Sequence, residues 1–270
     1  MNRIDRMFAR LKAENRKAFV TFTVACDPSF EESLERLRIF ADSGIDLIEI
    51  CHPYSDPILD GATIQKANRR GLVAGGSLAR TVDLCAAFRE NDAVTPLILM
   101  GYANPLAAMG YEAFSSRAAA AGIDGIIVAD VPIREADTLL EALMMHGLVM
   151  IPLATPALSP ADFAVVRPGI GGFLYCIPVV GPTGGPSASI EAITDAVERC
   201  RGVSALPILV GFGVKSPELA ARVAEIADGV IVATALMDRF EVLRSEMHSA
   251  VEYKTAIGDI IAAYRMAIDH

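Results

Sequence analysis

The sequence predicts a (β/α)8 TIM barrel with one extra helix at its N-terminus, formed as a single domain by residues 1–270. Short apolar runs rich in β-branched residues recur along the chain, helical patterns rich in Ala, Leu, Glu and Arg separate them, and no low-complexity linker interrupts them. Eight strands of even weight favour closure into a barrel over the competing doubly wound open sheet. The runs lie at 19–25, 45–51, 96–101, 125–129, 148–154, 172–177, 207–212 and 229–234.

Start signals mark several of the helices between these runs. Ser29, followed three residues later by Glu32, predicts a capping box, and the segments SPAD (159–162) and SPEL (216–219) each place Ser at the N-cap and Pro at the first helical position. Before the first run, apolar residues at helical spacing predict an amphipathic helix that plugs the bottom of the barrel. These apolar residues are Ile4, Met7, Phe8 and Leu11.

The composition argues against several classes of protein. Apolar residues make up 53% of the chain and the mean hydropathy is +0.40, yet no apolar run reaches the ~18 residues of a membrane helix. Buried parallel strands account for such a composition. The net charge of −9 and the pI near 5.0 argue against binding to nucleic acid or to anionic membranes. Five cysteines without a C-x-x-C pair predict reduced thiols in a cytoplasmic protein, and no His and Cys residues have metal-ligand spacing.

Polar residues follow the predicted strands, at the end where barrels of this class carry function. Carboxylates gather after the second to fourth runs, at Glu49, Asp56, Asp60 and Asp130, whereas Gly, Ser and Thr gather after the sixth to eighth. Glycine amides beside a helix N-terminus form the usual phosphate site of this fold, so we expect acid/base chemistry on a phosphorylated small molecule. Plainer interpretations stay open, because a strand-end acid also forms structural ion pairs, Asp60 before Gly61 is typical of a turn, and aromatic residues are usually core.

A long motif after the second run carries a resemblance to a known family. Glu49 is followed by PYSDPILDGATIQ from Pro53 to Gln65, which is a specific pattern. Shorter matches run along the chain: DPS at 27–29, GYANP at 101–105, GIDGIIVADVP at 122–132, GPTG at 181–184 and GFGVKSPE at 211–218. On these residues the sequence resembles the tryptophan synthase alpha subunit family across nearly its full length.

The resemblance implies the fold already predicted and a specific reaction. Members of that family cleave indole-3-glycerol phosphate by a retro-aldol reaction into indole and glyceraldehyde 3-phosphate. The indole passes to a beta subunit that contains pyridoxal phosphate (PLP). The resemblance thus implies a lyase of tryptophan biosynthesis that has no cofactor or metal of its own. Its partner would be a beta subunit in an alpha2-beta2 complex, with no binding to nucleic acid or membrane.

The resemblance also implies roles for individual residues. Glu49 is expected to transfer protons as general acid and base, and Asp60 to accept the indole N–H and stabilise positive charge on the ring. Asp56 and Pro57 are expected at the partner interface. The expected indole pocket comprises Phe22, Met100, Tyr102, Ile127, Ala129, Leu153 and Tyr175. The expected phosphate site and closing loop comprise Thr183, Gly184, Phe212, Gly213, Ala233 and Thr234.

The chain departs from the family's usual residues around the expected site. Cys51 and His52 replace a usual Gly-Val pair, Cys26 replaces a Gly, Pro178–Val180 replaces Ser-Arg-Ala, and Ala233 replaces a Gly. Because cysteine disfavours backbone angles that glycine allows, we expect the loop after Cys51 to be stiffer or redirected, with His52 facing solvent. Two alternatives therefore stand beside an alpha subunit: a free-standing lyase acting on a related phosphorylated aldol, and a weakly catalytic partner of a beta subunit.

Overall fold

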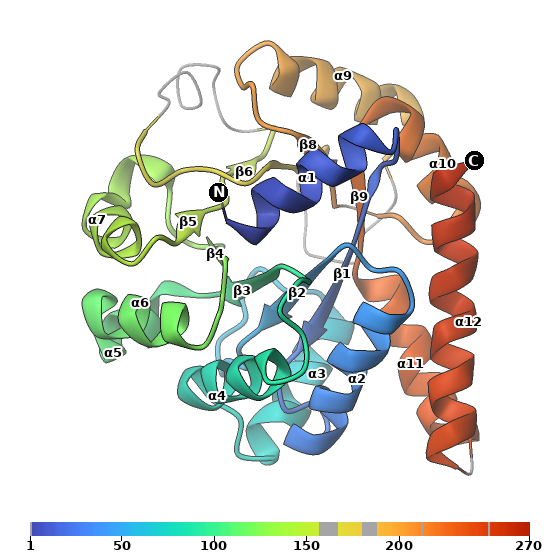
Figure 1. Ribbon diagram of the computed structural model, residues 1–270, viewed down its shortest axis with the longest axis horizontal. Helices are drawn as coiled ribbons and strands as arrows, with labels where there is room; N and C mark the ends of the chain where they lie inside the picture. Colours follow the sequence, from blue (N-terminus) through green and yellow to red (C-terminus); the bar gives the residue numbers. More distant parts are fainter. Residues whose placement is uncertain (1, 157–166, 180–187, 212, 248) are drawn as a thin grey trace.

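A computed structural model describes the chain except for residues 1, 157–166, 180–187, 212 and 248 (Figure 1). Within the described residues, parallel strands alternate with helices. The strands are β1 (Ala18–Val24), β2 (Leu47–Cys51), β3 (Leu97–Gly101), β4 (Gly125–Val128), β5 (Val149–Met150), β6 (Leu153–Ala154), β7 (Leu174–Cys176), β8 (Ile208–Val210) and β9 (Gly229–Val232). The helices are α1 (Arg3–Ala13), α2 (Phe30–Asp42), α3 (Ala62–Val73), α4 (Leu78–Arg89), α5 (Ala103–Met109), α6 (Tyr111–Ala120), α7 (Asp137–Met145), α9 (Ile190–Arg201), α10 (Pro217–Ile226), α11 (Thr234–Glu246), α12 (Ala250–Asp269) and the short 3-10 helix η1 (Ile133–Glu135).

The sheet closes into a barrel through the segment 149–154. Its strands are hydrogen-bonded in the order β5-β4-β3-β2-β1-β9-β8-β7-β6. β5 and β6 are two halves of one barrel strand that is interrupted at Pro152, which has no N–H to donate to a neighbouring strand. On one side the Ile151 N–H donates to the Ile126 carbonyl at 2.9 Å, and on the other the Pro152 carbonyl accepts from the Tyr175 N–H at 2.9 Å. The predicted (β/α)8 barrel is therefore confirmed, and the open sheet is excluded.

Helix α1 covers the N-terminal end of the barrel, as the sequence predicted. Its first turn is fixed by a capping box in which Asn2 and Asp5 each accept the other's backbone N–H. Its buried face, formed by Ile4, Met7 and Leu11, packs on the inward-facing side chains of the strands. Figure 1 shows α1 lying across this end of the barrel, with the other helices around it.

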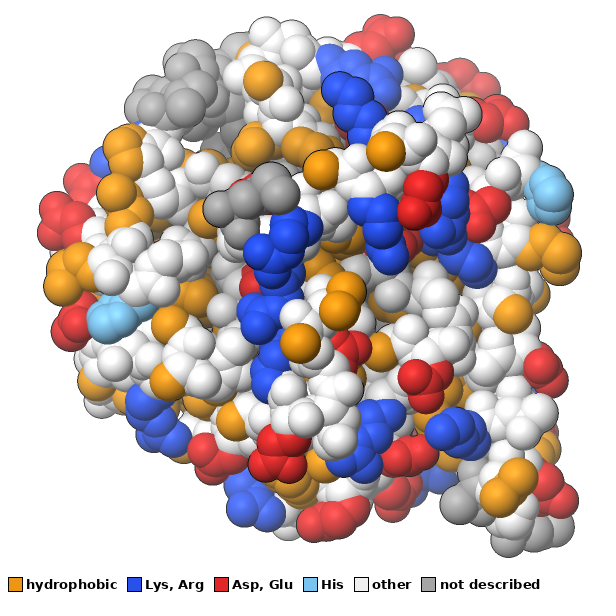
Figure 2. Space-filling model, viewed as in Figure 1, with side chains coloured by type: hydrophobic (Ala, Val, Ile, Leu, Met, Phe, Trp, Pro, Cys, Tyr) orange, Lys and Arg blue, Asp and Glu red, His pale blue; other side chains and the backbone are white. Residues whose placement is uncertain are grey.

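Basic and acidic side chains pair at the same end of the molecule. Figure 2, which views this end, shows Lys and Arg side chains gathered near the centre of the face. Two of the arginines on α1 reach buried carboxylates at the starts of strands. Arg10 lies 3.0 Å from Asp46, and Arg3 lies 2.9 Å from Asp124. The ion pairs join the N-terminal helix to the barrel it covers.

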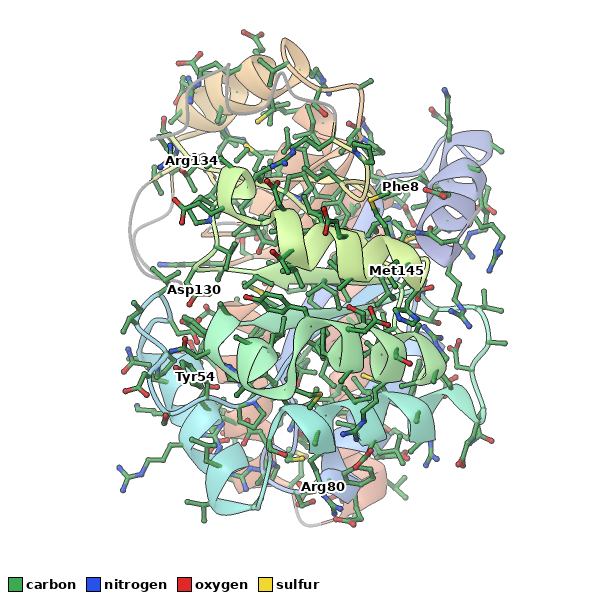
Figure 3. The ribbon with its side chains drawn as sticks, turned by 90° about the vertical axis from the view of Figure 1, so that its left-hand side faces the viewer. Phe8, Tyr54, Arg80, Asp130, Arg134 and Met145 are labelled. Atoms are coloured by element: carbon green, nitrogen blue, oxygen red, sulfur yellow. The ribbon has the colours of Figure 1, made fainter. Side chains whose placement is uncertain are left out.

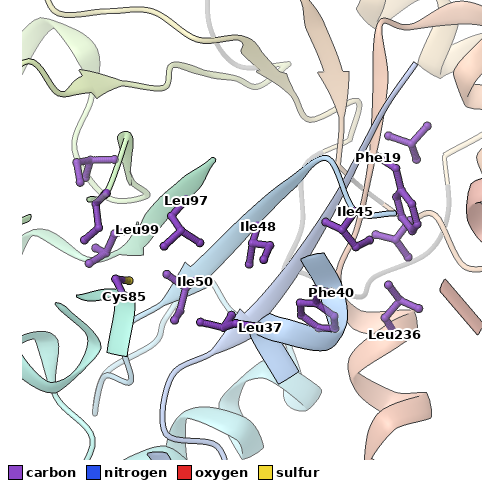
Figure 4. Packing of buried hydrophobic residues seen from close by; sticks show 14 of the residues in the cluster. Phe19, Leu37, Phe40, Ile45, Ile48, Ile50, Cys85, Leu97, Leu99 and Leu236 are labelled. Atoms are coloured by element: carbon purple, nitrogen blue, oxygen red, sulfur yellow. The ribbon is translucent and has the colours of Figure 1, made fainter. Parts of the chain in front are cut away.

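The larger hydrophobic core lies between the sheet and the surrounding helices. Successive side chains of a strand point to opposite faces, so Ile48 and Ile50 point outward to the helices whereas Glu49 points into the barrel. Figure 4 shows Ile48 and Ile50 in one layer with Leu37 and Phe40 of α2. Burying one such side chain contributes about 1.5–3 kcal/mol. This outer layer of apolar side chains therefore holds the strands against the surrounding helices.

The helix starts agree with the sequence where they are described. Ser29 is the N-cap of α2 and accepts the Glu32 N–H at 3.1 Å, but the return bond from the Ser29 N–H to the Glu32 side chain is not formed, so the predicted capping box is only half present. Ser216 caps α10 with Pro217 at its first position. The segment 159–162 lies outside the described residues. No single described helix is long and apolar enough to cross a membrane; α3 and α4, bent by 89° at their junction, satisfy the length and composition together.

Candidate active site

The side chains predicted to act in catalysis lie at the end of the barrel opposite α1. Figure 3 views the barrel from the side, with Phe8 of α1 toward one end and Tyr54, Asp130 and Arg134 toward the other. Because all strands are parallel, their C-terminal ends meet at this second end. Residues far apart in the sequence are brought together there by β1 to β4, β6 and β7.

Glu49 is a buried carboxyl group without a partner. It lies in the middle of β2, in register with Phe22 of β1 and Ile98 of β3, and it is 0% exposed. Neither of its side-chain oxygens has a hydrogen-bond partner among the described residues. Burial disfavours the charged form and raises the pKa of Glu49 to about 8. The group is therefore mostly protonated at neutral pH and has a proton to give.

Two neutral polar groups share the barrel interior with Glu49. Burial raises the pKa of both the Cys51 thiol and the Tyr175 hydroxyl. The negative charges of Asp60 and Glu49 add to this for Cys51, and that of Glu49 adds to it for Tyr175. The Tyr175 hydroxyl donates to the Gly211 carbonyl at 3.3 Å. Its ring lies so close to Gly211 that a Cβ there would come within 2.3 Å of it. Tyr175 is thus fixed beside Glu49, and Glu49 is the member of this group that titrates near neutrality.

Asp60 comes from the loop between β2 and α3 and is 9% exposed. The Asn68 amide of α3 donates to its Oδ2 at 3.1 Å, and the Tyr102 hydroxyl forms a second hydrogen bond to the carboxyl group. Burial raises the pKa of Asp60 to about 6, and the two hydrogen bonds act in the opposite direction. Asp60 is therefore mainly ionised at neutral pH, where Glu49 is mainly protonated. Two carboxyl groups with separated pKa values are what paired acid and base roles require.

The loop that carries Asp60 is tied to β3 and α3. The Tyr102 hydroxyl accepts a hydrogen bond from the Leu59 N–H at 3.1 Å, and the Tyr54 N–H donates to Asn68 Oδ1 at 2.9 Å. The rings of Tyr54 and Tyr102 pack with their centroids 5.1 Å apart. Asn68 and Tyr102 therefore contact both the Asp60 carboxyl group and the backbone of its loop.

Two of the seven residues predicted for the indole pocket line the cavity at this end of the barrel, and neither Glu49 nor Asp60 is among its lining residues. Ala129 and Leu153 line an apolar cavity of about 680 Å³. Ile127 and Tyr175 belong to the interior cluster of the barrel, and Met100 and Leu153 pack against that cluster. Met100 also packs against the neighbouring cluster that contains Phe22. Tyr102 is buried at the end of β3, over the loop that carries Asp60.

Part of the cavity wall was missed by reasoning from the sequence. It comes from the loop after β2 and from the segment after β4, and it comprises Ile58, Leu59, Val131, Pro132, Ile133 and Arg134. Ile58 is 77% exposed and Leu59 is 44% exposed, which is unusual for large apolar side chains in a short loop. The apolar pair between Pro57 and Asp60 was the signal available in the sequence.

The predicted phosphate side is described in part. Thr183, Gly184 and Phe212 lie outside the described residues. Gly213 has a φ of 72°, in the left-handed region that glycine adopts without strain. Ala233 is the N-cap of α11 and provides no side-chain cap, and Thr234 is the first residue of that helix. A helix N-terminus without a side-chain cap leaves amides and the positive end of the helix dipole available to an anion.

The residues predicted for partner contact form a tight, outward-facing turn. Asp56 is exposed, and its carbonyl accepts from the Ile58 N–H at 2.9 Å. The Pro57 carbonyl accepts from the Asp60 N–H at 3.0 Å. The turn therefore displays Asp56 and Ile58 on the surface while it directs Asp60 inward.

One expectation drawn from the chain's unusual residues was wrong, and another stays a prediction. Cys51 is the last residue of β2, paired with Val24 and Met100, and a stiffer or redirected loop after it stays a prediction. The cysteine in a left-handed conformation is Cys26, with a φ of 59°. His52 does not face solvent: it is 0% exposed. Its ring fits against Gly101, where a Cβ would lie 2.0 Å from Nε2, so the missing side chain on the neighbouring strand makes room for it.

The fold and the site define a (β/α)8-barrel protein with two carboxyl groups of opposite protonation state near an apolar cavity. No described residues form a group of three or more His, Cys, Asp and Glu side chains placed to hold a metal.

Comparisons with known proteins give the family. A family model described as "Tryptophan synthase alpha chain" matches residues 8–264. The tryptophan synthase alpha chain of Caulobacter vibrioides (strain NA1000 / CB15N) is 48% identical over 240 residues, which cover 89% of this chain and 87% of that protein. The crystal structure of tryptophan synthase subunit alpha from Legionella pneumophila str. Paris has a TM-score of 0.91 at 34% identity, covering 99% of this chain and 98% of that one. The chain belongs to the tryptophan synthase alpha chain family.

A further solved structure is similar at lower identity. Tryptophan synthase from M. tuberculosis, in its aminoacrylate- and BRD0059-bound form, gives a TM-score of 0.85 at 30% identity, covering 100% of this chain and 99% of that one. The similarity therefore covers essentially the full length of both chains.

Proposed function

We propose that this chain is the alpha subunit of a tryptophan synthase, a carbon–carbon lyase that cleaves indole-3-glycerol phosphate into indole and glyceraldehyde 3-phosphate. Family membership supports the activity. At the site, the activity is supported by Glu49, a carboxyl group that is fully buried, mostly protonated at neutral pH and without a hydrogen-bond partner among the described residues. The similar proteins are alpha chains of tryptophan synthase, so they do not favour a free-standing lyase or a weakly catalytic partner.

Glu49 would move both protons of the reaction. Its protonated form gives a proton to the ring carbon that bears the glycerol chain. The resulting carboxylate takes the proton of the hydroxyl on the adjacent chain carbon as the carbon–carbon bond breaks. The bonding electrons return to the ring, the chain leaves as an aldehyde, and Glu49 ends protonated again. A pKa of about 8 suits a group that must act as acid and then as base near neutral pH.

Asp60 would stabilise the charge that the first proton transfer creates. Protonation of the ring carbon places positive charge on the indole nitrogen and strengthens its N–H as a donor. An ionised carboxylate held in a water-poor site is well suited to accept that hydrogen bond. The Asn68 and Tyr102 hydrogen bonds lower the pKa of Asp60 and so support the ionised form.

The remaining predicted residues would hold the substrate. The apolar residues Phe22, Met100, Ile127, Ala129, Leu153 and Tyr175, together with Tyr102, suit a flat aromatic ring. The phosphate would bind at the N-terminus of α11, near Gly213, Ala233 and Thr234. We further propose that Thr183, Gly184 and Phe212 complete that site and its closing loop.

The product indole would pass to a beta subunit. We propose an alpha2-beta2 complex in which the exposed turn at Asp56 and Pro57 contacts that partner, and Ile58 supplies apolar surface beside it. PLP would belong to the beta subunit, and this chain would need no cofactor. A cytoplasmic location is supported by five cysteines that are all free and buried.

An assay of the purified chain tests the proposal. Indole-3-glycerol phosphate is supplied to the chain alone and to the chain mixed with a beta subunit, and both products are measured. We expect cleavage by the chain alone and faster cleavage in the mixture. The Glu49→Gln variant is the control for contaminating activity. Absence of cleavage in both conditions by a folded protein would overturn the proposed function.

A further inference from the structure

His52 is a buried histidine that accepts a hydrogen bond at the edge of the candidate site. It follows β2 directly, and its Nε2 accepts the backbone N–H of Tyr102 at 3.2 Å. Since Nε2 is an acceptor in this contact, the ring proton is on Nδ1. Gly101 lies beneath the ring, and the Tyr54 ring packs against it edge-on at a centroid distance of 6.2 Å.

The residue that His52 holds is the one that contacts the catalytic loop. Tyr102 directly follows β3, and its hydroxyl contacts both the Leu59 N–H and the Asp60 carboxyl group. A shift of the Tyr102 backbone would therefore move the hydroxyl away from Asp60. Asn68 would remain as the described side-chain donor on that carboxyl group.

We propose that His52 is a positioning residue for the lyase reaction: by accepting the Tyr102 N–H it fixes the tyrosine that orients Asp60. The proposal rests on the proposed role of Asp60 and deepens it. His52 would act through Tyr102, because the described hydrogen bond of its ring is with the Tyr102 backbone N–H.

The neutral state of the ring suits this role. Nε2 accepts a hydrogen bond only while it is unprotonated. The groups that face the ring are the Tyr102 N–H, the Pro53 backbone, the Tyr54 ring and the more distant charge of Asp130. Nδ1 has no hydrogen-bond partner among the described residues. Burial lowers the pKa of His52 to about 4, and the acceptor is therefore available throughout the neutral range.

A matched pair of variants separates hydrogen bonding from packing. His52→Gln places an acceptor oxygen the same number of bonds from Cβ as Nε2, and His52→Met fills similar space without that acceptor. We expect His52→Met to lower kcat about 10-fold, with KM changed less, because a small misplacement of a catalytic group is costly. The acidic limb of its kcat–pH profile should move to higher pH as Asp60 loses a donor. His52→Gln should restore most of kcat and the wild-type limb.

An NMR measurement on the wild-type protein tests the contact without using activity. The ring nitrogens of His52 should have the signature of the neutral Nδ1–H form, and the Tyr102 amide resonance should move in His52→Met but little in His52→Gln. Finding the Nε2–H form would overturn the proposal, as would equal kcat loss in both variants or an unchanged kcat in His52→Met. If the wild type failed to cleave indole-3-glycerol phosphate, the proposed function would fail, while the NMR result would still decide the His52–Tyr102 contact.

Discussion

Buried carboxylates occur at both ends of this barrel, but those at the N-terminal end are paired and Glu49 at the other end is not. Asp46, at the start of β2, receives Arg265 at 2.7 Å, Arg10 at 3.0 Å and the Phe19 N–H at 3.0 Å. Three residues further along the same segment, Glu49 has no hydrogen-bond partner among the described residues. Asp46 and Glu49 are therefore close in the sequence, but in the described part of the chain only Asp46 has cations around its carboxyl group.

Two other buried acids show that pairing with arginine does not depend on which end of the barrel an acid occupies. Asp124 at the N-terminal end is paired with Arg3 and Arg89 at 2.9 and 3.0 Å. Asp27 lies beyond β1 at the catalytic end, yet Arg70 binds it through two hydrogen bonds of 2.6 and 2.8 Å.

The comparison separates structural acids from chemical ones. A carboxylate held by arginines keeps its charge and its position, whereas a carboxyl group such as Glu49, buried with neither a cation nor a described hydrogen-bond donor, keeps its proton.

The largest effect is expected from Glu49→Gln. Gln keeps the shape of Glu49 but has no proton to transfer, so the rate of cleavage should fall ~10²–10⁴-fold or below detection. The fold should persist, because no ion pair is lost. Turnover assays and circular dichroism on the same preparation measure both. Near-normal turnover would remove Glu49 from the reaction.

The matched change at the other end is Asp124→Asn. It leaves Arg89, which is largely buried, without its closest carboxylate, so the free energy of unfolding should fall by about 3 kcal/mol. The kcat of the folded protein should stay within about twofold, because Asp124 lies far from the site along the barrel. Urea unfolding and turnover at low temperature test this. A strong loss of kcat with unchanged stability would contradict the structural role of Asp124.

Asp60→Asn should have a smaller effect on turnover than Glu49→Gln. The amide removes a charge that stabilises the transition state but carries no transferred proton, so kcat should fall ~10²-fold. KM for the substrate is expected to change less, since the apolar pocket remains. Steady-state kinetics on both variants give the ranking, and an inverted order would exchange the two roles.

The smallest effect is expected from anion binding alone. Titration with glycerol phosphate should move the amide resonances of Gly213, Ala233, Thr234 and Ala235 first, because a helix N-terminus supplies the donors. Resonances near Asp46 serve as the reference from the other end. If the resonances near Asp46 moved first, the proposed position of the phosphate site would be wrong.

Periodicity and motif were sufficient to predict the barrel, its N-terminal plug and the candidate acids. These features depend on patterns that are local in the sequence, such as apolar runs, the spacing of Ile4, Met7 and Leu11, and the strand-2 motif. The division of the fifth barrel strand at Pro152 had a local signal as well, since proline interrupts a sheet ladder.

The surroundings of single side chains could not be predicted in the same way. His52 is buried because Gly101 on another strand leaves space, and Glu49 is unpaired because no arginine of the described part of the chain forms an ion pair with it. Both facts depend on residues that are distant in the sequence. The left-handed conformation belongs to Cys26 instead of Cys51 for a similar reason, because β2 continues its pairing through Cys51.

The unpaired state of Glu49 also predicts a dependence of stability on pH. Its pKa in the folded protein, about 8, lies above the value of about 4.5 expected when unfolded. The stability that Glu49 contributes is therefore fully present below about pH 4.5 and is lost as the pH rises through about 8. Glu49→Gln should flatten this part of the stability curve.

The most direct test is a titration of the Glu49 carboxyl carbon by 13C NMR, with Glu49→Gln used to assign its resonance. An unpaired, buried carboxyl group should ionise with a midpoint near pH 8. A midpoint near pH 4.5 for Glu49 would mean that water or a cation reaches it, and would contradict the separation of structural and chemical acids.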